Sequence, residues 1–89
     1  MLVLPADLTR NEAAACLRML VQGLRTESSP MVTVDASALN RFDSSALAVL
    51  LEFRRQGQAM GKTLAVSAMP ERLRSLAVLY GIGELLPAG

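Results

Sequence analysis

The sequence has 89 residues, 52% of them hydrophobic and 19% charged, with a formal net charge of +1. This length is enough for one small domain over residues 1–89 and too short for two. The chain has no histidine and one cysteine, which excludes a Ser-His-Asp or Cys-His catalytic set, an internal disulfide and a four-ligand zinc site. Nine basic against eight acidic residues, with two Phe and one Tyr as the aromatic residues, disfavour nucleic-acid binding. We therefore expect a protein that is not an enzyme and that has no cofactor or metal.

The first half of the chain alternates strand-like and helix-like patterns. Residues 2–4 form a short apolar run that Pro5 stops, which predicts a strand. A helix is predicted from Thr9 or Asn11 to about residue 25, because apolar residues recur there at steps of three and four. The β-branched run Met31–Asp35 has the strongest strand pattern and is expected to be the central strand.

The second half repeats the alternation. A helix is predicted from residues 43–45 to about residue 60, and its first half is apolar nearly all round. Such a helix is either deeply buried or covered by a partner on one side. Thr63–Ser67 is the next predicted strand, and a third helix is predicted between Pro70 and Gly81. Residues 82–87 are expected to fold back onto the body, so the chain belongs to the α/β class.

The longest apolar stretches are too short to cross a membrane. Residues 46–51 and 76–83 fall far below the ~20 residues that span a bilayer. Residues 1–5 also lack the basic region of a signal peptide. We expect a cytoplasmic protein with no direct membrane insertion.

The segment Asp43-Ser44-Ser45 is the candidate site for chemistry. Two hydroxyl groups follow a carboxylate at a helix N-terminus, where a phosphate would gain roughly 0.3–1 kcal/mol from the helix dipole. The alternative is an ordinary N-cap, in which Asp43 or Ser44 satisfies backbone N–H groups and does nothing else. Leu79 and Tyr80 make the end of the third helix unusually apolar, which is consistent either with burial under the tail or with a partner.

The motif V-D, a short connection, D-S-S and a helix over residues 34–51 resembles the signature of the STAS domain. The resemblance extends over roughly residues 2 to 87. Within that family, the L-A-x-L-Y element at residues 76–80 and the L-P element at residues 86–87 are similar to the MlaB branch of small cytoplasmic subunits. The resemblance to STAS domains implies a STAS-like fold, with a small mixed β-sheet and about three helices packed on one face.

The resemblance also implies a function. The MlaB branch consists of non-catalytic subunits of phospholipid-transport ABC complexes, which bind an MlaF-like ATPase subunit and through it a permease of the inner membrane, and which maintain outer-membrane lipid asymmetry. The antagonist branch implies the alternative, an anti-sigma factor antagonist regulated by phosphorylation of Ser44. Ser44, Asp43 and Ser45 then become the site of phosphorylation or partner contact. The implied docking residues are Leu47, Arg72, Leu79 and Tyr80.

Two features depart from the family pattern. Ala46 stands where the family usually has Gly, which is expected to tighten access around Ser44. STAS domains commonly begin with a further strand, whereas this sequence starts near what resembles the second one. The uncovered sheet edge is therefore expected to be exposed or to pair with a second copy in a homodimer.

Overall fold

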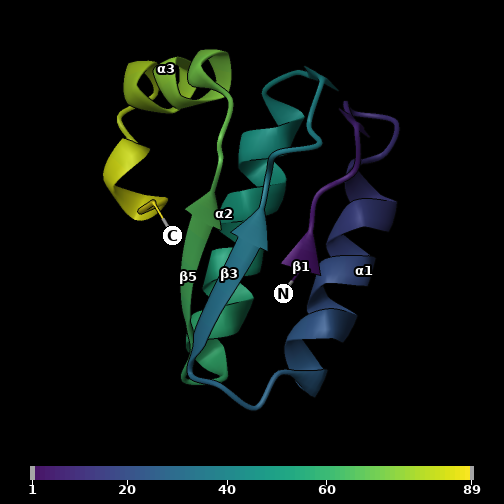
Figure 1. Cartoon of the computed structure of the whole chain (residues 1–89), viewed down its shortest axis with the longest axis vertical. Coiled ribbons are helices and arrows are strands. Elements are labelled where there is room, and N and C mark those ends of the chain that lie inside the picture. Colours follow the sequence, from purple (N-terminus) through teal and green to yellow (C-terminus); the bar gives the residue numbers. More distant parts are fainter. Residues whose placement is uncertain (1, 89) are drawn as a thin grey trace.

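A parallel three-stranded sheet forms the centre of the computed structural model, which describes residues 2–88 (Figure 1). Its strands are β1 (Leu2–Val3), β3 (Met31–Asp35) and β5 (Thr63–Ser67), in the order β1-β3-β5. Val32 and Val34 point into the core from β3, while Met31 on the other face is exposed. The prediction that Met31–Asp35 is the central strand is confirmed.

The connections between these strands explain their direction. Helix α1 (Ala13–Thr26) joins β1 to β3, and α2 (Ser45–Ala59) joins β3 to β5. A crossover helix returns the chain to the end of the sheet at which the preceding strand began, so successive strands are parallel. The α/β class and the three helices are confirmed. Every pairing between the described strands is parallel, whereas the sequence analysis expected a mixed sheet.

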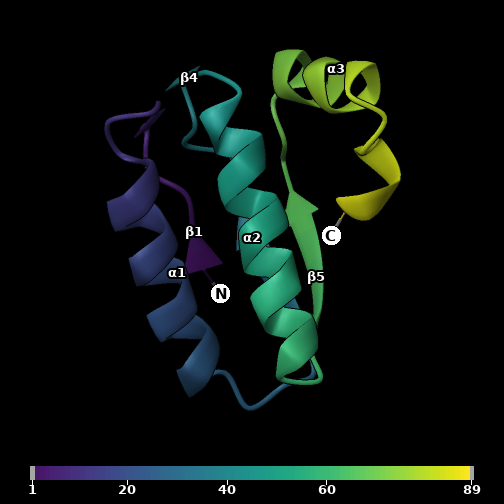
Figure 2. The same cartoon turned by 180° about the vertical axis from the view of Figure 1, so that it is seen from behind.

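Helices α1 and α2 lie side by side on one face of the sheet (Figure 2). α1 buries Cys16, Leu20 and Leu24, at the spacing of one helical face, and α2 buries Phe53 against the same core. The third helix, α3 (Glu71–Leu79), lies past the carboxyl ends of the strands instead of on that face (Figure 1).

The turn after β5 sends α3 away from the sheet face. Ala68 has a φ of 55°, and Pro70 keeps an extended ψ of 141° just before the helix. These two residues redirect the chain immediately after the strand. None of the helices within residues 2–88 is long and apolar enough to span a bilayer.

A second, two-stranded sheet lies near the start of α1. Its strands, β2 (Asp7–Leu8) and β4 (Arg41–Phe42), pair in parallel, and the Ala6 carbonyl accepts hydrogen bonds from the N–H groups of Asn40 and Arg41. The sequence analysis did not predict this two-stranded sheet. Its strand β4 precedes α2, so the pairing with β2 holds the segment that leads into this helix.

The C-terminal segment closes the fold. After the short 3-10 helix η1 (Gly83–Leu85), Leu86 is fully buried and the Pro87 carbonyl accepts a 2.8 Å hydrogen bond from the N–H of Val66 in β5. Arg74 of α3 donates to the Leu86 carbonyl at 2.8 Å. The expectation that residues 82–87 fold back onto the body is confirmed.

Candidate protein-docking site

The turn before α2 is organised by the Asp43 carboxylate. Oδ1 of Asp43 accepts a 2.8 Å hydrogen bond from the N–H of Ser45, the first residue of α2, and Oδ2 accepts one at 3.3 Å from the N–H of Arg10. The hydrogen bond from Ser45 is the main reason that the pKa of Asp43 lies below its usual value. Asp43 therefore remains ionised at neutral pH and satisfies one of the free N–H groups at the helix start.

Ser44 is exposed beside that carboxylate. Its carbonyl accepts hydrogen bonds from the N–H groups of Leu47 and Ala48, while its hydroxyl makes no capping hydrogen bond within the described chain. Ala46 is fully buried and points away from solvent, so it does not close off access to Ser44 as the sequence analysis expected. The capping role belongs to Asp43, which leaves the Ser44 hydroxyl accessible at the helix start.

Leu47 is a core residue and not part of the docking surface. Its side chain is 2% exposed, and Ala46, Val49 and Leu50 beside it are equally buried. The sequence left deep burial and a partner as the two explanations for the apolar character of this helical segment, and the resemblance to STAS domains implied that Leu47 contacts a partner. The structure covers the segment with its own sheet and helices, so Leu47 is removed from the set of docking residues.

Arg72 connects α3 to the Asp43 turn. Its guanidinium stacks over the Phe42 ring, 4.6 Å from the centroid, and Phe42 precedes Asp43. A cation over an aromatic face is held electrostatically, which keeps the first turn of α3 next to the start of α2. Arg72 itself remains exposed and able to meet a partner.

Three consecutive apolar side chains are exposed at the other end of α3. Val78, Leu79 and Tyr80 are 64%, 77% and 57% exposed, and Leu85 of η1 is exposed as well. The tail does not cover Leu79 and Tyr80, which was one of the two explanations that the sequence left open. Solvent exposure of adjacent large apolar side chains is typical of a protein-binding surface.

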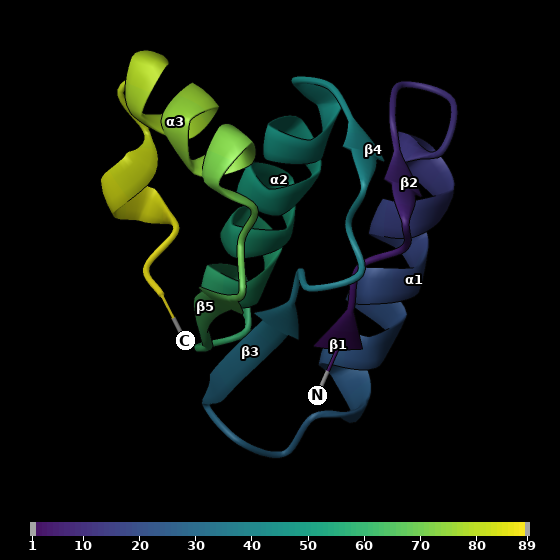
Figure 3. The ribbon, with the colours of Figure 1, turned by 45° about the horizontal axis from the view of Figure 1, so that its top comes forward.

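The predicted site residues therefore share one end of the molecule without forming a single cluster. The start of α2 and the whole of α3 lie at the carboxyl ends of the strands (Figure 3). Arg72 lies next to the Asp43–Ser45 turn, whereas Leu79 and Tyr80 lie at the far end of α3, roughly 10 Å further along the helix axis. Within residues 2–88, no three Cys, Asp or Glu side chains come together as metal ligands would.

A surface with one anchored carboxylate, one accessible hydroxyl, one stacked arginine and an apolar ridge is suited to binding a protein. A family model described as "Mlab, STAS domain" matches residues 1–87. The chain belongs to the MlaB STAS domain family. Among curated proteins, none matches this chain at a significant level. The STAS fold thus places the Asp43–Ser45 turn and α3 at the same end of this family member.

Proposed function

We propose that this STAS protein is the non-catalytic subunit of an Mla-type phospholipid-transport ABC transporter, where it binds and supports the ATPase subunit. The family match over residues 1–87 supports the transporter class. The observation that carries the proposal is the exposed apolar ridge of Val78, Leu79 and Tyr80, which lacks a cover within the described chain. Burying such a ridge against a partner would add the apolar contact that a small domain cannot make alone.

The complex determines where the protein acts. The proposed subunit is cytoplasmic and reaches the inner membrane only through the ATPase and its permease. Its contribution to outer-membrane lipid asymmetry is indirect. No contact with lipid is assigned to its own residues.

The test begins with identification of the partner in the host. A tagged protein, purified gently, should bring along an ABC ATPase and a membrane permease, which mass spectrometry identifies. Replacing Leu79 or Tyr80 with Ala should weaken the binding of the purified ATPase by about tenfold, as expected for a central apolar residue of an interface. Met19→Ala is the matched control, because Met19 is comparably exposed but lies on α1. Equal binding by the Tyr80→Ala variant and the control would contradict the proposed surface.

The alternative function is an anti-sigma factor antagonist whose release depends on phosphorylation of Ser44. The exposed Ser44 hydroxyl favours it, because a kinase needs access to the group that it modifies. Co-purification of a histidine-kinase-like ATPase or a sigma factor would support this alternative and reject the transporter.

Two substitutions of Ser44 distinguish the mechanisms. Ser44→Glu places a second charge beside Asp43 and should weaken docking in both cases. Ser44→Ala should retain the transporter ATPase, whereas a phosphorylation switch with this change should no longer release its partner. Release of Ser44→Ala by the kinase as efficiently as wild type would count against the switch.

Self-association is proposed through the outer edge of β1. This strand pairs with β3 on one side, and no described strand pairs with its other side. An unpaired edge can accept a strand from a second copy. Light scattering over a concentration series tests this self-association. If the molar mass equals that of one chain at every concentration, the homodimer is rejected.

A further inference from the structure

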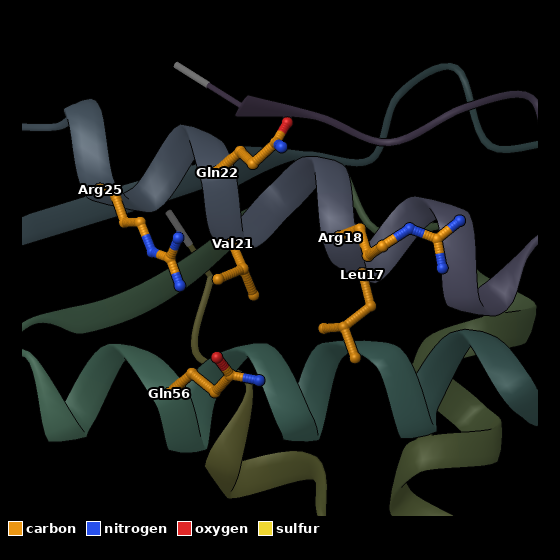
Figure 4. Close-up of a pocket in the computed structure, with 6 residues that line it drawn as sticks. All are labelled: Leu17, Arg18, Val21, Gln22, Arg25 and Gln56. Atoms are coloured by element: carbon orange, nitrogen blue, oxygen red, sulfur yellow. The ribbon is translucent and has the colours of Figure 1, made fainter.

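A groove runs between α1 and α2 on the side of the molecule that faces away from the sheet (Figure 4). Leu17 and Val21 of α1 point toward α2 and form its apolar floor, and Gln56 of α2 points back toward α1. The groove has a volume of about 270 Å³ and continues past Leu17 toward Ala13 and Ala48 at the start of both helices. From residue 13 to residue 25 it extends roughly 18 Å, or about three helical turns.

Two arginines flank this apolar floor. Arg18 and Arg25 both line the groove and are exposed, and their side chains make no hydrogen bond or ion pair with any residue of the described chain. Their spacing of seven residues places them on one side of α1, roughly 10 Å apart along the helix axis. Glu52 is the one acidic residue among the described residues that line the groove, and its carboxylate already accepts hydrogen bonds from Arg55 and Gln56. The positive charge of the groove is therefore available to an external ligand.

We propose that this α1–α2 groove binds an acidic amphipathic helix of a partner protein. The apolar side chains of that helix pack on Leu17 and Val21, and two of its carboxylates, about seven residues apart, pair with Arg18 and Arg25. The partner helix has the same rise per residue as α1. Two carboxylates seven residues apart on a partner helix parallel or antiparallel to α1 therefore reach Arg18 and Arg25 at the same time. The groove is separate from the ridge at the end of α3 and does not depend on the proposed transporter function.

The shape of the groove favours a helix over an anionic membrane surface. Leu17 and Val21 are half-buried between two helices, where inserted side chains reach them and a flat headgroup layer does not. Peripheral membrane helices instead present protruding apolar residues with many cations. The large exposed apolar residue of α1, Met19, lines a different hollow beside Cys16. The groove thus has the form of a helix-in-groove receptor.

The test uses the full chain and a synthetic probe. The probe is a fluorescein-labelled, alanine-rich helical peptide with leucines along one face and two glutamates seven residues apart; the control peptide has glutamine in place of both glutamates. We expect the glutamate peptide to bind more tightly, by fluorescence anisotropy, than the glutamine peptide. Arg18→Glu and Arg25→Glu should each weaken its binding by about three- to tenfold, because attraction becomes repulsion. Amide chemical shifts should change along α1 and α2.

Arg10→Glu is the matched control, because it makes the same change of charge in the loop before α1. It should bind the glutamate peptide as wild type does, and so should Tyr80→Ala. Circular dichroism confirms that each variant is folded. Equal binding of the two peptides, or equal weakening by Arg10→Glu, would overturn the proposal. So would an Arg18- and Arg25-dependent association with phosphatidylserine vesicles in the absence of peptide binding, which would assign the groove to a membrane surface.

Discussion

The Asp43 carboxylate determines both the start of α2 and part of the acid sensitivity of the protein. Its hydrogen bonds to the N–H groups of Ser45 and Arg10 favour the ionised form, and the pKa of Asp43 is lowered accordingly. Thr9 similarly lowers the pKa of Glu12 through its backbone N–H and its hydroxyl. A carboxyl whose folded-state pKa is lowered stabilises the fold fully above the unfolded pKa, and this contribution is lost as the pH falls through the folded pKa.

Asp43→Ala should therefore lower the melting temperature at neutral pH and have less effect in acid. Below the usual aspartate pKa of about 3.9, wild type progressively protonates the same carboxylate and loses its advantage. Thermal unfolding of wild type and variant across this pH range measures the convergence. A difference in melting temperature that stays constant down to about pH 3 would contradict the role of the ionised carboxylate.

The candidate site could be predicted from the sequence only where its residues are neighbours in the chain. Asp43, Ser44 and Ser45 follow one another before an apolar helix, and local helix-start chemistry identified them. The contact of Arg72 with Phe42 joins residues 30 positions apart, and no local pattern signals it. Leu47 was misassigned because an apolar helical face has the same sequence whether its own chain or a partner covers it.

At the scale of elements, long periodic segments were predicted well and short ones were not. The strands β3 and β5 have the predicted bounds, and each helix begins and ends within four residues of its predicted bounds, because all of these elements have several apolar residues at a regular spacing. The strands β2 and β4 have two residues each, too few to show a period, and they exist through pairing across more than 30 residues. The placement of α3 past the strand ends depends on the turn at Ala68, whose positive φ is not evident from an alanine in the sequence.

The two glycines at the end of α2 have different structural roles. Gly57 is buried inside the helix, and a Cβ there would meet Leu24 and Lys62 at ordinary contact distances of 3.8 Å or more. Gly57→Ala should therefore stabilise the protein by about 0.5–1 kcal/mol, because it reduces the backbone entropy of the unfolded chain without strain. Urea unfolding measures the difference in the free energy of unfolding.

Gly61→Ala is the matched comparison, because Gly61 lies in the turn that follows α2. Gly61 has a φ of +75°, and a Cβ there would meet no atom within 4 Å. Its substitution should destabilise the protein by about 1–2 kcal/mol through backbone strain alone. A Gly57→Ala variant that is less stable than wild type, or a Gly61→Ala variant that is more stable, would contradict this assignment.

At the scale of the whole molecule, the two proposed surfaces lie on different elements of one small body. The α3 helix and the start of α2 lie at the carboxyl ends of the strands (Figure 3), whereas the groove lies between α1 and α2, the two helices that cover one face of the sheet (Figure 2). α2 contributes to both, through its first turn and through Gln56. Because the surfaces use separate side chains, a substitution in one leaves the side chains of the other unchanged.

The position of the α3 ridge depends on the C-terminal segment. The side chain of Leu86 is fully buried, and its carbonyl accepts a hydrogen bond from Arg74 of α3. The carbonyl of Pro87, the next residue, accepts a hydrogen bond from the N–H of Val66 in β5. One buried leucine thus connects α3, η1 and the sheet. Leu86→Ala should cost about 2–5 kcal/mol of unfolding free energy, a large part of the ~5–15 kcal/mol that stabilises a domain.

Leu85→Ala is the control, because Leu85 is its chain neighbour and is exposed; we expect it to cost about 1 kcal/mol or less. Chemical unfolding gives both free energies, and hydrogen exchange shows where the structure loosens. In Leu86→Ala, the amides of α3 should exchange faster relative to those of α1, because α3 loses its anchor while α1 keeps its contacts with α2 and the core. Uniformly faster exchange in both helices would instead mean that Leu86 supports the whole core and not α3 in particular.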